Sequence, residues 1–486
     1  MKKQHDVSRR KFLKDASIVG VGLSVQPFSI VRRADTGKAR IGIIGVGGRG
    51  TSHLKGLLSR PDVEIPAICD IRKAHAARAK DLVVKSGREA PEVYTVAGAI
   101  YEPRETVPGS ALPIPVETAE SRDAYKKLIA RDDIDAVIIA TPWRFHVPIA
   151  VAAMQAGKYV GVEVPAAYTI DGCWDLVNTS EATGMPCMIL ENVCYRRDVM
   201  AILNMIRQGL FGEMIHARCG YQHNLKLLDE HGNFGPGTGG EAVWRTYHHI
   251  KRNGDLYPTH GIGPVAHWFD INRGNRFVKM TATATKARGL HEKIVERAGK
   301  DSPNAAIRFK KGDVVTSTIT TSNGETIIVT NNTTLSRPYS LGFRGQGTDG
   351  LWHVFNTNLN TGGNAPGGIY AETDKAIYLK NLSPHHDRWE SFGPYQEKYD
   401  APLYKKYAKQ SEGAGHGGMD WYVRNAFVES VKHKMPPPID VYDAAAWSVI
   451  GPLSEQSIAR GGAPVDFPDF TRGRWLHNAR IFNIEG

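Results

Sequence analysis

The sequence has few cysteines, and neither their number nor their setting suggests disulfides. There are five, all in apolar or strand-like contexts: Cys69, Cys173, Cys187, Cys194 and Cys219. An odd number at such positions is typical of small core residues, and none has the paired spacing of a metal-binding motif. The chain also lacks an H-E-x-x-H motif, so His223, His260 and His267 do not predict zinc. We therefore expect no metal.

Long apolar runs and basic tracts are also missing. No apolar run reaches the roughly 18 residues that suggest a membrane-spanning helix. The net charge is +11, but residues 1–33 hold eight Lys or Arg and two Asp, so they account for more than half of it. Because the rest of the charge is dispersed, we expect no nucleic-acid partner. Without internal repeats, a chain of 486 residues predicts two domains with separate cores.

The charged N-terminus resembles a twin-arginine export signal. Ser8–Lys14 reads S-R-R-K-F-L-K and is followed by a weakly apolar stretch, Ala16–Val25. This order predicts recognition by the twin-arginine translocation machinery and a periplasmic or exported protein. The alternative is a basic amphipathic N-terminal helix. Unpaired core cysteines fit folding in a reducing cytoplasm before export.

A glycine-rich stretch, Ala39–Gly50, reads A-R-I-G-I-I-G-V-G-G-R-G. Its apolar half predicts a buried strand, and the glycines form G-x-G-x-x-G before a helical stretch, Thr51–Leu58. In such a turn the first glycine permits the turn, the second lets the backbone approach a pyrophosphate, and the third lets the helix pack on the strand. The helix then points its N-terminal N–H groups at the phosphates.

An acidic residue follows the next predicted strand. The apolar run Val63–Cys69 ends at Asp70, about 20 residues beyond the glycines, where dinucleotide-binding folds hold the ribose hydroxyls. The acid favours NAD over NADP, although Arg49 and Arg72 act against that preference. The alternative for the whole stretch is a glycine-rich turn closed by an aspartate at a helix N-cap. We predict cofactor binding, with NAD as the cofactor.

Strands and helices alternate as far as residue 212. After Asp70 we expect helices at 72–86, 123–130, 148–156, 171–183 and 197–208, and strands at 135–140, 159–165 and 188–191. Ala97–Glu120, rich in Pro, Glu and Ala, is expected to be a long surface loop. The alternation predicts a Rossmann-type, doubly wound parallel sheet.

From residue 213 the predicted strands alternate in polarity. They are 214–222, 278–285, 314–321, 326–331, 340–345 and 375–379, followed by helices at 419–431 and 442–459. This pattern predicts an α+β domain with a largely antiparallel, open sheet that has one covered face. The expected fold class is α/β, with a signal region at 1–33, an NAD-binding domain at 38–212, a substrate and oligomerisation domain at 213–415, and C-terminal helices and tail at 416–486 that pack back on the first domain. The exposed sheet face suggests a homo-oligomer.

Several segments together resemble one enzyme family. The G-V-G-G-R-G turn, the strand end A-T-P-W-R-F-H (Ala140–His146) and the triplet E-V-P (Glu163–Pro165) are similar to the glucose–fructose oxidoreductase/inositol dehydrogenase family. Within it, four segments resemble glycoside hydrolase family 109: E-N-V-C-Y-R-R-D (Glu191–Asp198), N-G-D-L-Y-P-T-H-G-I-G-P-V (Asn253–Val265), R-P-Y-S-L-G-F (Arg337–Phe343) and G-A-G-H-G-G-M-D (Gly413–Asp420). The resemblance implies an NAD-dependent α-N-acetylgalactosaminidase that acts on glycans with terminal N-acetylgalactosamine.

One departure separates the chain from ordinary dehydrogenases of the parent family. Those enzymes carry E-K-P, whose lysine helps to move the hydroxyl proton, whereas Val164 lies between Glu163 and Pro165 here. A valine side chain carries no proton. The mechanism that the resemblance implies is oxidation of the sugar C3 by bound NAD, loss of the C2 hydrogen, elimination at C1, addition of water, and re-reduction. Such an enzyme keeps its NAD bound.

The same resemblance and the residue types give the candidate site. Catalytic candidates are His260, Tyr257 and Tyr195; His260, expected in a loop, leads because an imidazole titrates near neutral pH. Expected substrate contacts are Tyr221, Arg245, Tyr257, Pro258, Thr259, His260 and Tyr339. Expected cofactor contacts are Gly45, Gly47, Gly48, Arg49, Gly50, Asp70, Trp143, Arg144, Phe145, His146, Glu163, Val164 and Asn192. Tyr221 and Tyr339 are equally compatible with plain packing. His248 and His249 are expected in a solvated turn, and His416, flanked by glycines, is a further candidate for the cleft.

Two other functions remain open from the sequence. One is an exported NAD(P)-dependent sugar oxidoreductase with tightly bound cofactor, which the E-V-P triplet argues against. The other is a non-catalytic sugar-binding protein that keeps the dinucleotide fold as a scaffold. The titratable residues of L-Y-P-T-H-G argue against that, because binding alone needs no poised base.

Overall fold

The computed structural model describes residues 37–98, 101–107, 113–234, 242–354, 375–386 and 388–485. The predicted twin-arginine segment lies outside these residues. From residue 37 onward the chain belongs to one compact unit. Among the described helices, none combines the length and the hydropathy that crossing a membrane requires.

A parallel sheet forms around the glycine-rich segment, as predicted. Its strand order is β4–β3–β1–β7–β8–β9, with β2 beside the start of β1, and every pairing is parallel. The strands are β1 (Ala39–Ile44), β2 (Val63–Glu64), β3 (Ala67–Cys69), β4 (Glu92–Tyr94), β7 (Ala136–Ile139), β8 (Tyr159–Val162) and β9 (Cys187–Ile189). The strand order reverses between β1 and β7, and ligands bind such sheets in the crevice at that point, beyond the carboxyl ends of the strands.

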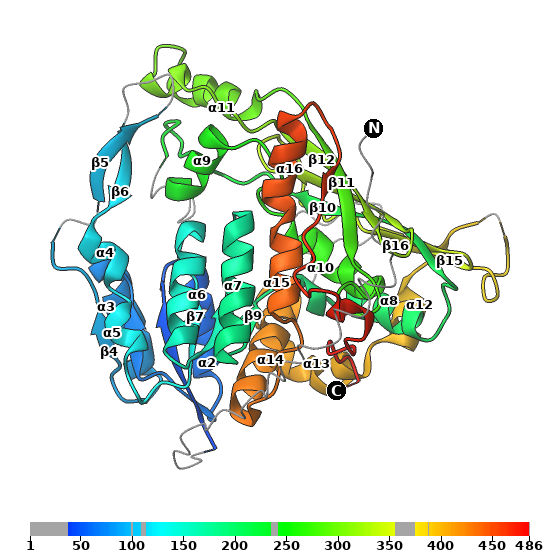
Figure 1. Ribbon diagram of the computed structural model, residues 1–486, viewed down its shortest axis with the longest axis horizontal. Helices are drawn as coiled ribbons and strands as arrows, with labels where there is room; N and C mark the ends of the chain where they lie inside the picture. The colour runs from blue at the N-terminus through cyan, green and yellow to red at the C-terminus, as the bar shows by residue number, and fades with distance from the viewer. Residues whose placement is uncertain are drawn as a thin grey trace, which may run out of the picture. The chain divides into compact units, whose positions relative to one another are not determined.

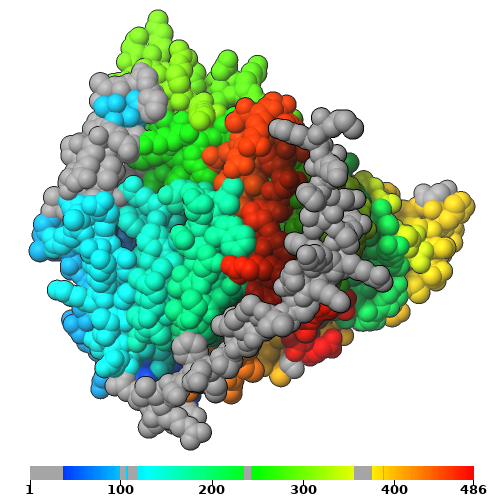
Figure 2. Space-filling view, in the orientation of Figure 1, coloured from blue at the N-terminus to red at the C-terminus, as the bar shows by residue number. Residues whose placement is uncertain are grey.

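Helices connect these strands and cover the sheet. They are α2 (Gly48–Leu58), α3 (Lys73–Lys85), α4 (Ala119–Asp123), α5 (Lys126–Ile129), α6 (His146–Gln155), α7 (Ile170–Thr183) and α8 (Arg197–Arg207). Figure 1 shows α6 and α7 next to each other, with α15 (Val441–Ser448) beside α7. In Figure 2 these helices form one continuous surface with α16 (Ile450–Ala459). Helices from the end of the chain therefore help to cover the first sheet.

The segment 97–120 is not the surface loop that we predicted. It contains a hairpin in which β5 (Tyr101–Thr106) pairs antiparallel with β6 (Pro113–Glu117), and α4 follows. Pro103 lies opposite Pro115 in this pairing. Proline is excluded from the middle of a sheet, but a two-stranded ribbon leaves each strand an outer edge where the missing N–H needs no partner. Because proline disfavours strand prediction, the sequence did not indicate these two strands.

A second sheet is mostly antiparallel, as predicted. Its order is β17–β16–β15–β14–β10–β13–β12–β11–β18, and among the described strands its one parallel pairing is β10 with β13. The strands are β10 (Met214–Gln222), β11 (Phe277–Ala284), β12 (Val314–Thr321), β13 (Thr326–Asn332), β14 (Arg344–Gly347), β15 (Gly350–Val354), β16 (Lys375–Leu379), β17 (Glu390–Ser391) and β18 (Val465–Asp466). Every second residue of β12 is buried, which is the pattern of a sheet with one covered face. The strand predicted at 340–345 begins later, as β14.

The helices of the second half cover this sheet or return to the first. They are α9 (Ala242–Lys251), α10 (Thr259–Trp268), α11 (Gly289–Ala298), α12 (Gly393–Tyr399), α13 (Pro402–Ser411), α14 (Met419–His433), α15 and α16; 3₁₀ turns lie at Trp143–Phe145 (η1), Asn192–Tyr195 (η2), Pro303–Ala306 (η4), His416–Gly418 (η6) and Arg474–Leu476 (η7). Helix α10 packs on β10, α16 packs on β11, and α14 contacts α2. The single helix predicted at 442–459 is divided into α15 and α16 at Val449.

Two expectations about individual residue types have different outcomes. All five cysteines are buried and unpaired, as expected of core residues. His248 and His249, however, lie on α9 and not in a solvated turn. The side chain of His249 is buried, and burial holds its pKa well below the usual value.

Candidate functional site

A cavity of about 910 Å³ lies at the carboxyl ends of the parallel strands. Its walls come from the glycine turn after β1, from the ends of β3, β7 and β8, and from β10, α9, α10 and η6. Its volume is within the range of pockets that enclose small ligands. Most of the predicted site residues line it: Gly45, Gly47, Gly48, Arg49, Asp70, Trp143, Phe145, His146, Glu163, Val164, Asn192, Tyr221, Arg245, Tyr257, His260 and Tyr339. The structure therefore brings the predicted cofactor and substrate residues to one cavity.

The glycines of the turn after β1 have different surroundings. A Cβ at Gly50 would lie 1.8 Å from the carbonyl oxygen of Gly45, and Gly45 itself has a φ of +85°. A Cβ at Gly47 would have only the His75 ring near it, at 4.0 Å, and one at Gly48 would meet nothing within 4 Å. Gly45 and Gly50 thus allow strand and helix to pack. Gly47 and Gly48 leave open backbone at the start of α2, where N–H groups and the helix dipole favour a phosphate.

Asp70 lies directly after β3, where an acid was predicted. Its Oδ2 accepts a hydrogen bond from the backbone N–H of Val46, and its Oδ1 accepts one from that of Arg72, both at 2.8 Å. The carboxylate therefore also holds the turn in shape. Arg72 and His75 line this part of the cavity. Arg49 is engaged by two other carboxylates and is not directed at this end.

Two buried polar atoms at the cavity wall fit a dinucleotide. Asn192 Oδ1 and Thr141 Oγ1 have no hydrogen-bond partner among the described residues, and both residues line the cavity. A buried polar atom without a partner costs about 1–3 kcal/mol. A dinucleotide carries ribose hydroxyls and an amide group that can supply such partners. Together with the open backbone at Gly47 and Gly48, these atoms make the residues present fit NAD.

The strand end Ala140–His146 contributes rings more than charges. The ring nitrogens of His146 lie 2.8 Å from the carbonyl oxygens of Pro165 and Thr141. Burial lowers the pKa of His146, and its two contacts with backbone carbonyl oxygens partly oppose that effect and hold the ring in place. Trp143, in η1, packs against Tyr257 with 5.9 Å between ring centroids. This segment therefore shapes the cavity and joins its two halves.

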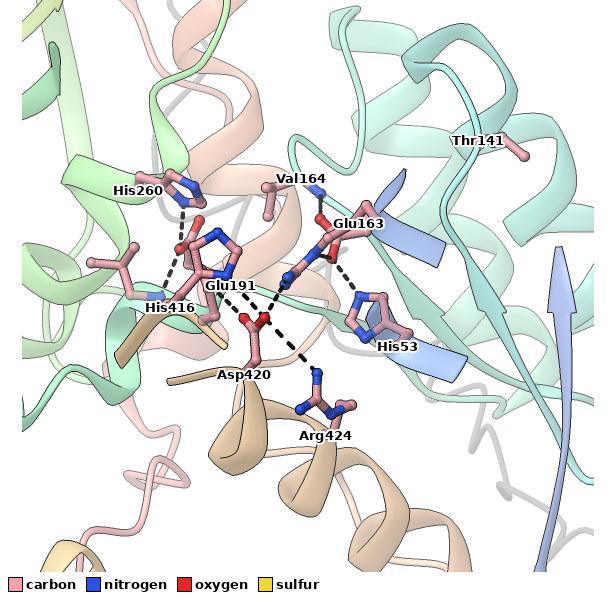
Figure 3. A network of polar contacts seen from close by, with 12 residues as sticks. His53, Thr141, Glu163, Val164, Glu191, His260, His416, Asp420 and Arg424 are labelled. Atoms are coloured by element: carbon pink, nitrogen blue, oxygen red, sulfur yellow. Dashed lines mark hydrogen bonds and ion pairs between the residues drawn. The ribbon is translucent and has the colours of Figure 1, made fainter. Parts of the chain in front are cut away.

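The E-V-P triplet places Glu163 in a buried network of charges, drawn in Figure 3. Glu163 Oε1 accepts hydrogen bonds from Arg49 Nε and from His53 Nε2, both at 2.6 Å. Burial opposes the charged form, but Arg49 and His53 hold the pKa of Glu163 well below its usual range. Burial lowers the pKa of His53, which donates as a neutral ring. The guanidinium of Arg49 thus brings a positive charge from the dinucleotide turn to Glu163, although Val164 stands where the parent family has a lysine.

His260 lies in the first turn of α10 and not in the loop that we predicted. Its Nδ1 donates a hydrogen bond to Glu191 Oε1 at 2.7 Å, and Glu191 is fully buried after β9. Two glycines let α10 approach: a Cβ at Gly261 would lie 2.6 Å from the backbone nitrogen of Gly220 in β10, and one at Gly263 would lie 3.1 Å from Glu191 Cγ. Because Nδ1 is engaged by Glu191, Nε2 is the ring nitrogen available to a ligand.

Aromatic rings surround His260. The ring centroids of Tyr257 and Tyr221 lie 4.9 and 5.3 Å from that of His260, and 4.7 Å from each other. Tyr339 lies 6.3 Å from Tyr221. The buried guanidinium of Arg245 lies over Tyr257, with 4.8 Å between its Cζ and the ring centroid. Apolar ring faces with a few convergent polar groups are the lining expected of a small-molecule site.

Another imidazole, that of His416, reaches the cavity from the glycine-rich segment before α14. His416 lines the cavity, and its Nδ1 donates to Asp420 Oδ2 at 2.9 Å. Asp420 also accepts hydrogen bonds from Arg49 Nη1 at 2.8 Å and from Asn192 Nδ2 at 2.7 Å. Two of the imidazoles that line the cavity are therefore held by fully buried carboxylates, His260 by Glu191 and His416 by Asp420.

Five predicted residues do not line the cavity: Tyr195, Gly50, Arg144, Pro258 and Thr259. Tyr195, which we predicted to be catalytic, lies outside the cavity wall. Its ring packs against Tyr422 and Phe482, at 6.3 and 5.0 Å between centroids, and burial raises its pKa well above the usual value. Gly50 acts in packing, Pro258 and Thr259 begin α10, and Arg144 lies over the Phe145 ring.

Sequence analysis gave no role to Glu191 and Asp420. The spacing of four between His416 and Asp420 at the start of a helix was a usable signal, because such residues share a face. No local signal joins Glu191 to His260, which lies 69 residues later. The described residues include no group of three or more His, Cys, Asp or Glu placed to hold a metal ion.

Comparisons with known proteins match the two parts of the chain to two different families. Residues 39–190 match the oxidoreductase family with an NAD-binding Rossmann fold, and residues 195–477 match the family described as glycosyl hydrolase 109, C-terminal domain. A glycosyl hydrolase family 109 protein of Stenotrophomonas maltophilia is 47% identical over 463 residues, covering 92% of each chain. An α-N-acetylgalactosaminidase of Tannerella forsythia is 44% identical over 508 aligned positions, covering 98% of this chain and 99% of the relative.

Solved structures share the fold at lower identity. A levoglucosan dehydrogenase in complex with NADH and levoglucosan superposes with a TM-score of 0.60 at 18% identity, covering 89% of this chain and all of that one. A probable dehydrogenase from Thermotoga maritima gives a TM-score of 0.55 at 15% identity. At these identities the likeness establishes the two-part architecture.

Proposed function

We propose that this chain, which belongs to glycosyl hydrolase family 109 and is a glycoside hydrolase that uses NAD, hydrolyses terminal α-N-acetylgalactosaminides. One observation carries the proposal: a single cavity joins an open dinucleotide turn to two imidazoles that buried carboxylates hold. Hydride chemistry needs the first feature, and proton transfer to and from a sugar needs the second. The name of the Tannerella relative supports the choice of sugar.

The residues that would hold NAD are those of the turn and of the strand ends. Gly47 and Gly48 leave N–H groups open for the pyrophosphate, Asp70 would accept from a ribose, and Thr141 and Asn192 have buried atoms that need partners. When bound, NAD supplies a reversible hydride acceptor for the sugar C3, and a ketone there makes the C2 hydrogen acidic. Because the reaction returns the cofactor to its starting form in each turnover, NAD would stay bound between turnovers.

His260 is proposed as the leading acid or base. Glu191 accepts from Nδ1, which fixes the tautomer and turns Nε2 toward the ligand. Tyr257 packs on the same ring and offers a hydroxyl to the substrate. The aromatic wall of Tyr221, Tyr339 and Arg245 would hold the sugar.

His416 is proposed as the second acid or base. An elimination needs a base at C2 and an acid at the leaving oxygen on C1, so one side chain does not suffice unless it moves between them. Like His260, His416 is an imidazole at the cavity wall that donates to a fully buried carboxylate. The two rings are proposed to share these tasks, since Val164 takes the place of the proton-carrying lysine of the parent family.

The test is an assay with an aryl α-N-acetylgalactosaminide. The proposal predicts release of the aryl alcohol with no accumulation of NADH, and little release from the matched aryl α-galactoside. Accumulating NADH without aryl alcohol would instead support the sugar oxidoreductase. Neither product from protein that holds NAD would support a non-catalytic binding protein.

Turnover in heavy water tests the C2 step. If the base equilibrates with solvent, the released sugar gains deuterium at C2, whereas a hydrolase with two carboxylates never breaks that bond. Deuterium elsewhere on the ring but not at C2 would contradict the proposed step.

We also propose export by the twin-arginine route, on the motif Ser8–Lys14. Replacing both Arg9 and Arg10 by Lys should retain the protein in the cytoplasm, as fractionation of cells would show, and unchanged export would contradict the assignment.

A homo-oligomer is proposed on the open face of the second sheet, where Ile215 is 46% exposed. Sedimentation would distinguish it from a monomer.

A further inference from the structure

Asp420 is a carboxylate with no exposed surface in the first turn of α14. Three hydrogen bonds reach it from three other segments, at 2.7 to 2.9 Å: from Arg49 Nη1 in the dinucleotide turn, from Asn192 Nδ2 after β9, and from His416 Nδ1 in η6. Arg424 Nη1, one turn further along α14, lies 3.9 Å from its Oδ2. Of these four partners, Arg49, Asn192 and His416 line the cavity.

The segment that carries His416 is shaped around this carboxylate. Gly415 has a φ of +90°, and a Cβ there would lie 2.8 Å from Asp420 Oδ2. His416 itself has a φ of +45°, a conformation that few residues other than glycine adopt and that is often found at functional sites. Arg424 Nη2 donates to the carbonyl oxygen of Ala414 at 3.0 Å and holds the segment from its other side. The position of the imidazole thus depends on Asp420.

The charges around Asp420 are balanced. Two carboxylates, Asp420 and Glu163, face two guanidinium groups, those of Arg49 and Arg424. Burial opposes the charge on Asp420, but Arg49 and His416 hold the pKa of the carboxyl well below its usual range. The facing residue on the remaining side, Asn192, is neutral. Removing the charge of Asp420 therefore leaves an excess positive charge next to His416.

We propose that Asp420 is a positioning residue, which orients His416 and links its place to the dinucleotide turn through Arg49. Arg49 donates to Glu163 and to Asp420 at once, so the turn and the His416 segment share one guanidinium. Because the inference assigns Asp420 to the reaction through His416, it rests on the proposed function. It adds a residue that contacts neither sugar nor cofactor in this account.

The experiment is a double-mutant cycle in the full-length protein with NAD bound, using the aryl α-N-acetylgalactosaminide. His416→Ala should lower kcat by about a hundredfold, the scale of losing a general acid or base. Asp420→Asn should lower kcat by roughly tenfold to a hundredfold, as loss of an orienting partner does, with KM and NAD content little changed. In the His416→Ala background, Asp420→Asn should have little further effect, because both act through one ring. Additive losses would overturn the inference, and so would near-normal kcat in Asp420→Asn.

Rescue by a charge-conserving variant supplies a readout that a purely structural role would not move. Asp420→Glu keeps a carboxylate that can face Arg49 and His416, so its kcat should be clearly higher than that of Asp420→Asn. A kcat for Asp420→Glu no higher than that of Asp420→Asn would contradict the proposal.

A matched control separates positioning from stability. Asp443 in α15 is also buried and pairs with an arginine, Arg273 at 2.7 Å, but does not line the cavity. Asp443→Asn should lower Tm without changing kcat per folded molecule. Failure of the proposed function would look different, since the unmodified protein would then not cleave the substrate, or His416→Ala would keep full activity.

Discussion

The cofactor side and the sugar side of the cavity are built by different means. The cofactor side uses backbone and small residues at the ends of parallel strands, such as Gly47, Gly48 and Asp70. The sugar side uses large side chains from separate elements, with Tyr221 on β10, Tyr257 before α10 and His416 before α14. On the cofactor side, the geometry of the site follows from the sheet. On the sugar side, the orientation of the two imidazoles depends on buried carboxylates, Glu191 for His260 and Asp420 for His416.

The difference has a physical reason. A pyrophosphate is recognised by N–H groups that any helix start supplies, so the turn needs room rather than particular side chains. Proton transfer needs an imidazole in a fixed orientation, which α10 gives only through Glu191 and through close approach at Gly261. We therefore expect substitutions on the cofactor side to change NAD retention, and those on the sugar side to change kcat.

The largest effect is expected at His260. His260→Ala should lower kcat by about a hundredfold or more, the usual scale for a general acid or base, while NAD stays bound. His267→Ala is a matched control on the same helix, because that ring stacks on Phe482 at 4.1 Å and does not line the cavity. It should lower Tm with kcat retained. Near-normal kcat in His260→Ala would contradict the role of His260 as the leading acid or base.

Two glycines of the turn should separate packing from ligand binding. Gly50→Ala places a Cβ against the Gly45 carbonyl oxygen, so it should destabilise the protein by about 1–3 kcal/mol or more, as overpacking does. Gly48→Ala meets open space, so it should leave Tm nearly unchanged and reduce NAD content where the pyrophosphate approaches. Thermal unfolding and the NAD content of purified protein measure both. Equal losses of Tm would contradict the assignment.

Asp70 is expected to have a smaller effect, on retention of the cofactor. Asp70→Ala removes the acceptor for a ribose and for the N–H groups of Val46 and Arg72, so NAD should be lost about tenfold faster on dialysis, equivalent to ~1.4 kcal/mol. Asp70→Asn keeps one acceptor oxygen, so its rate of NAD loss should lie between those of Asp70→Ala and the unmodified protein. Retention equal to that of the unmodified protein would remove Asp70 from the cofactor site.

The smallest effect is expected at Tyr195. Its hydroxyl is buried with no hydrogen-bond partner among the described residues, and its ring lies outside the cavity wall. Tyr195→Phe should change kcat by less than about twofold, because removing an unsatisfied hydroxyl is nearly neutral. A loss of activity as large as that of His260→Ala would instead support the catalytic role predicted for Tyr195.

Sequence analysis predicted the cofactor side better than the sugar side. The strand, the glycines and Asp70 lie within one short segment, and their spacing follows from the β–α–β geometry. The sugar side joins residues far apart in the chain. Glu191 meets His260 only because α10 packs closely against the segment after β9, and no periodicity in the sequence encodes that contact. Tyr195 lies only a few residues beyond Glu191, yet its ring turns into the core.

The most direct test of the account is hydrolysis by protein from which NAD has been removed. If NAD takes part in the reaction as proposed, stripped protein does not cleave an aryl α-N-acetylgalactosaminide, and equimolar NAD restores cleavage without net formation of NADH. A folded, NAD-free protein that hydrolyses the substrate at the rate of the untreated protein would contradict it.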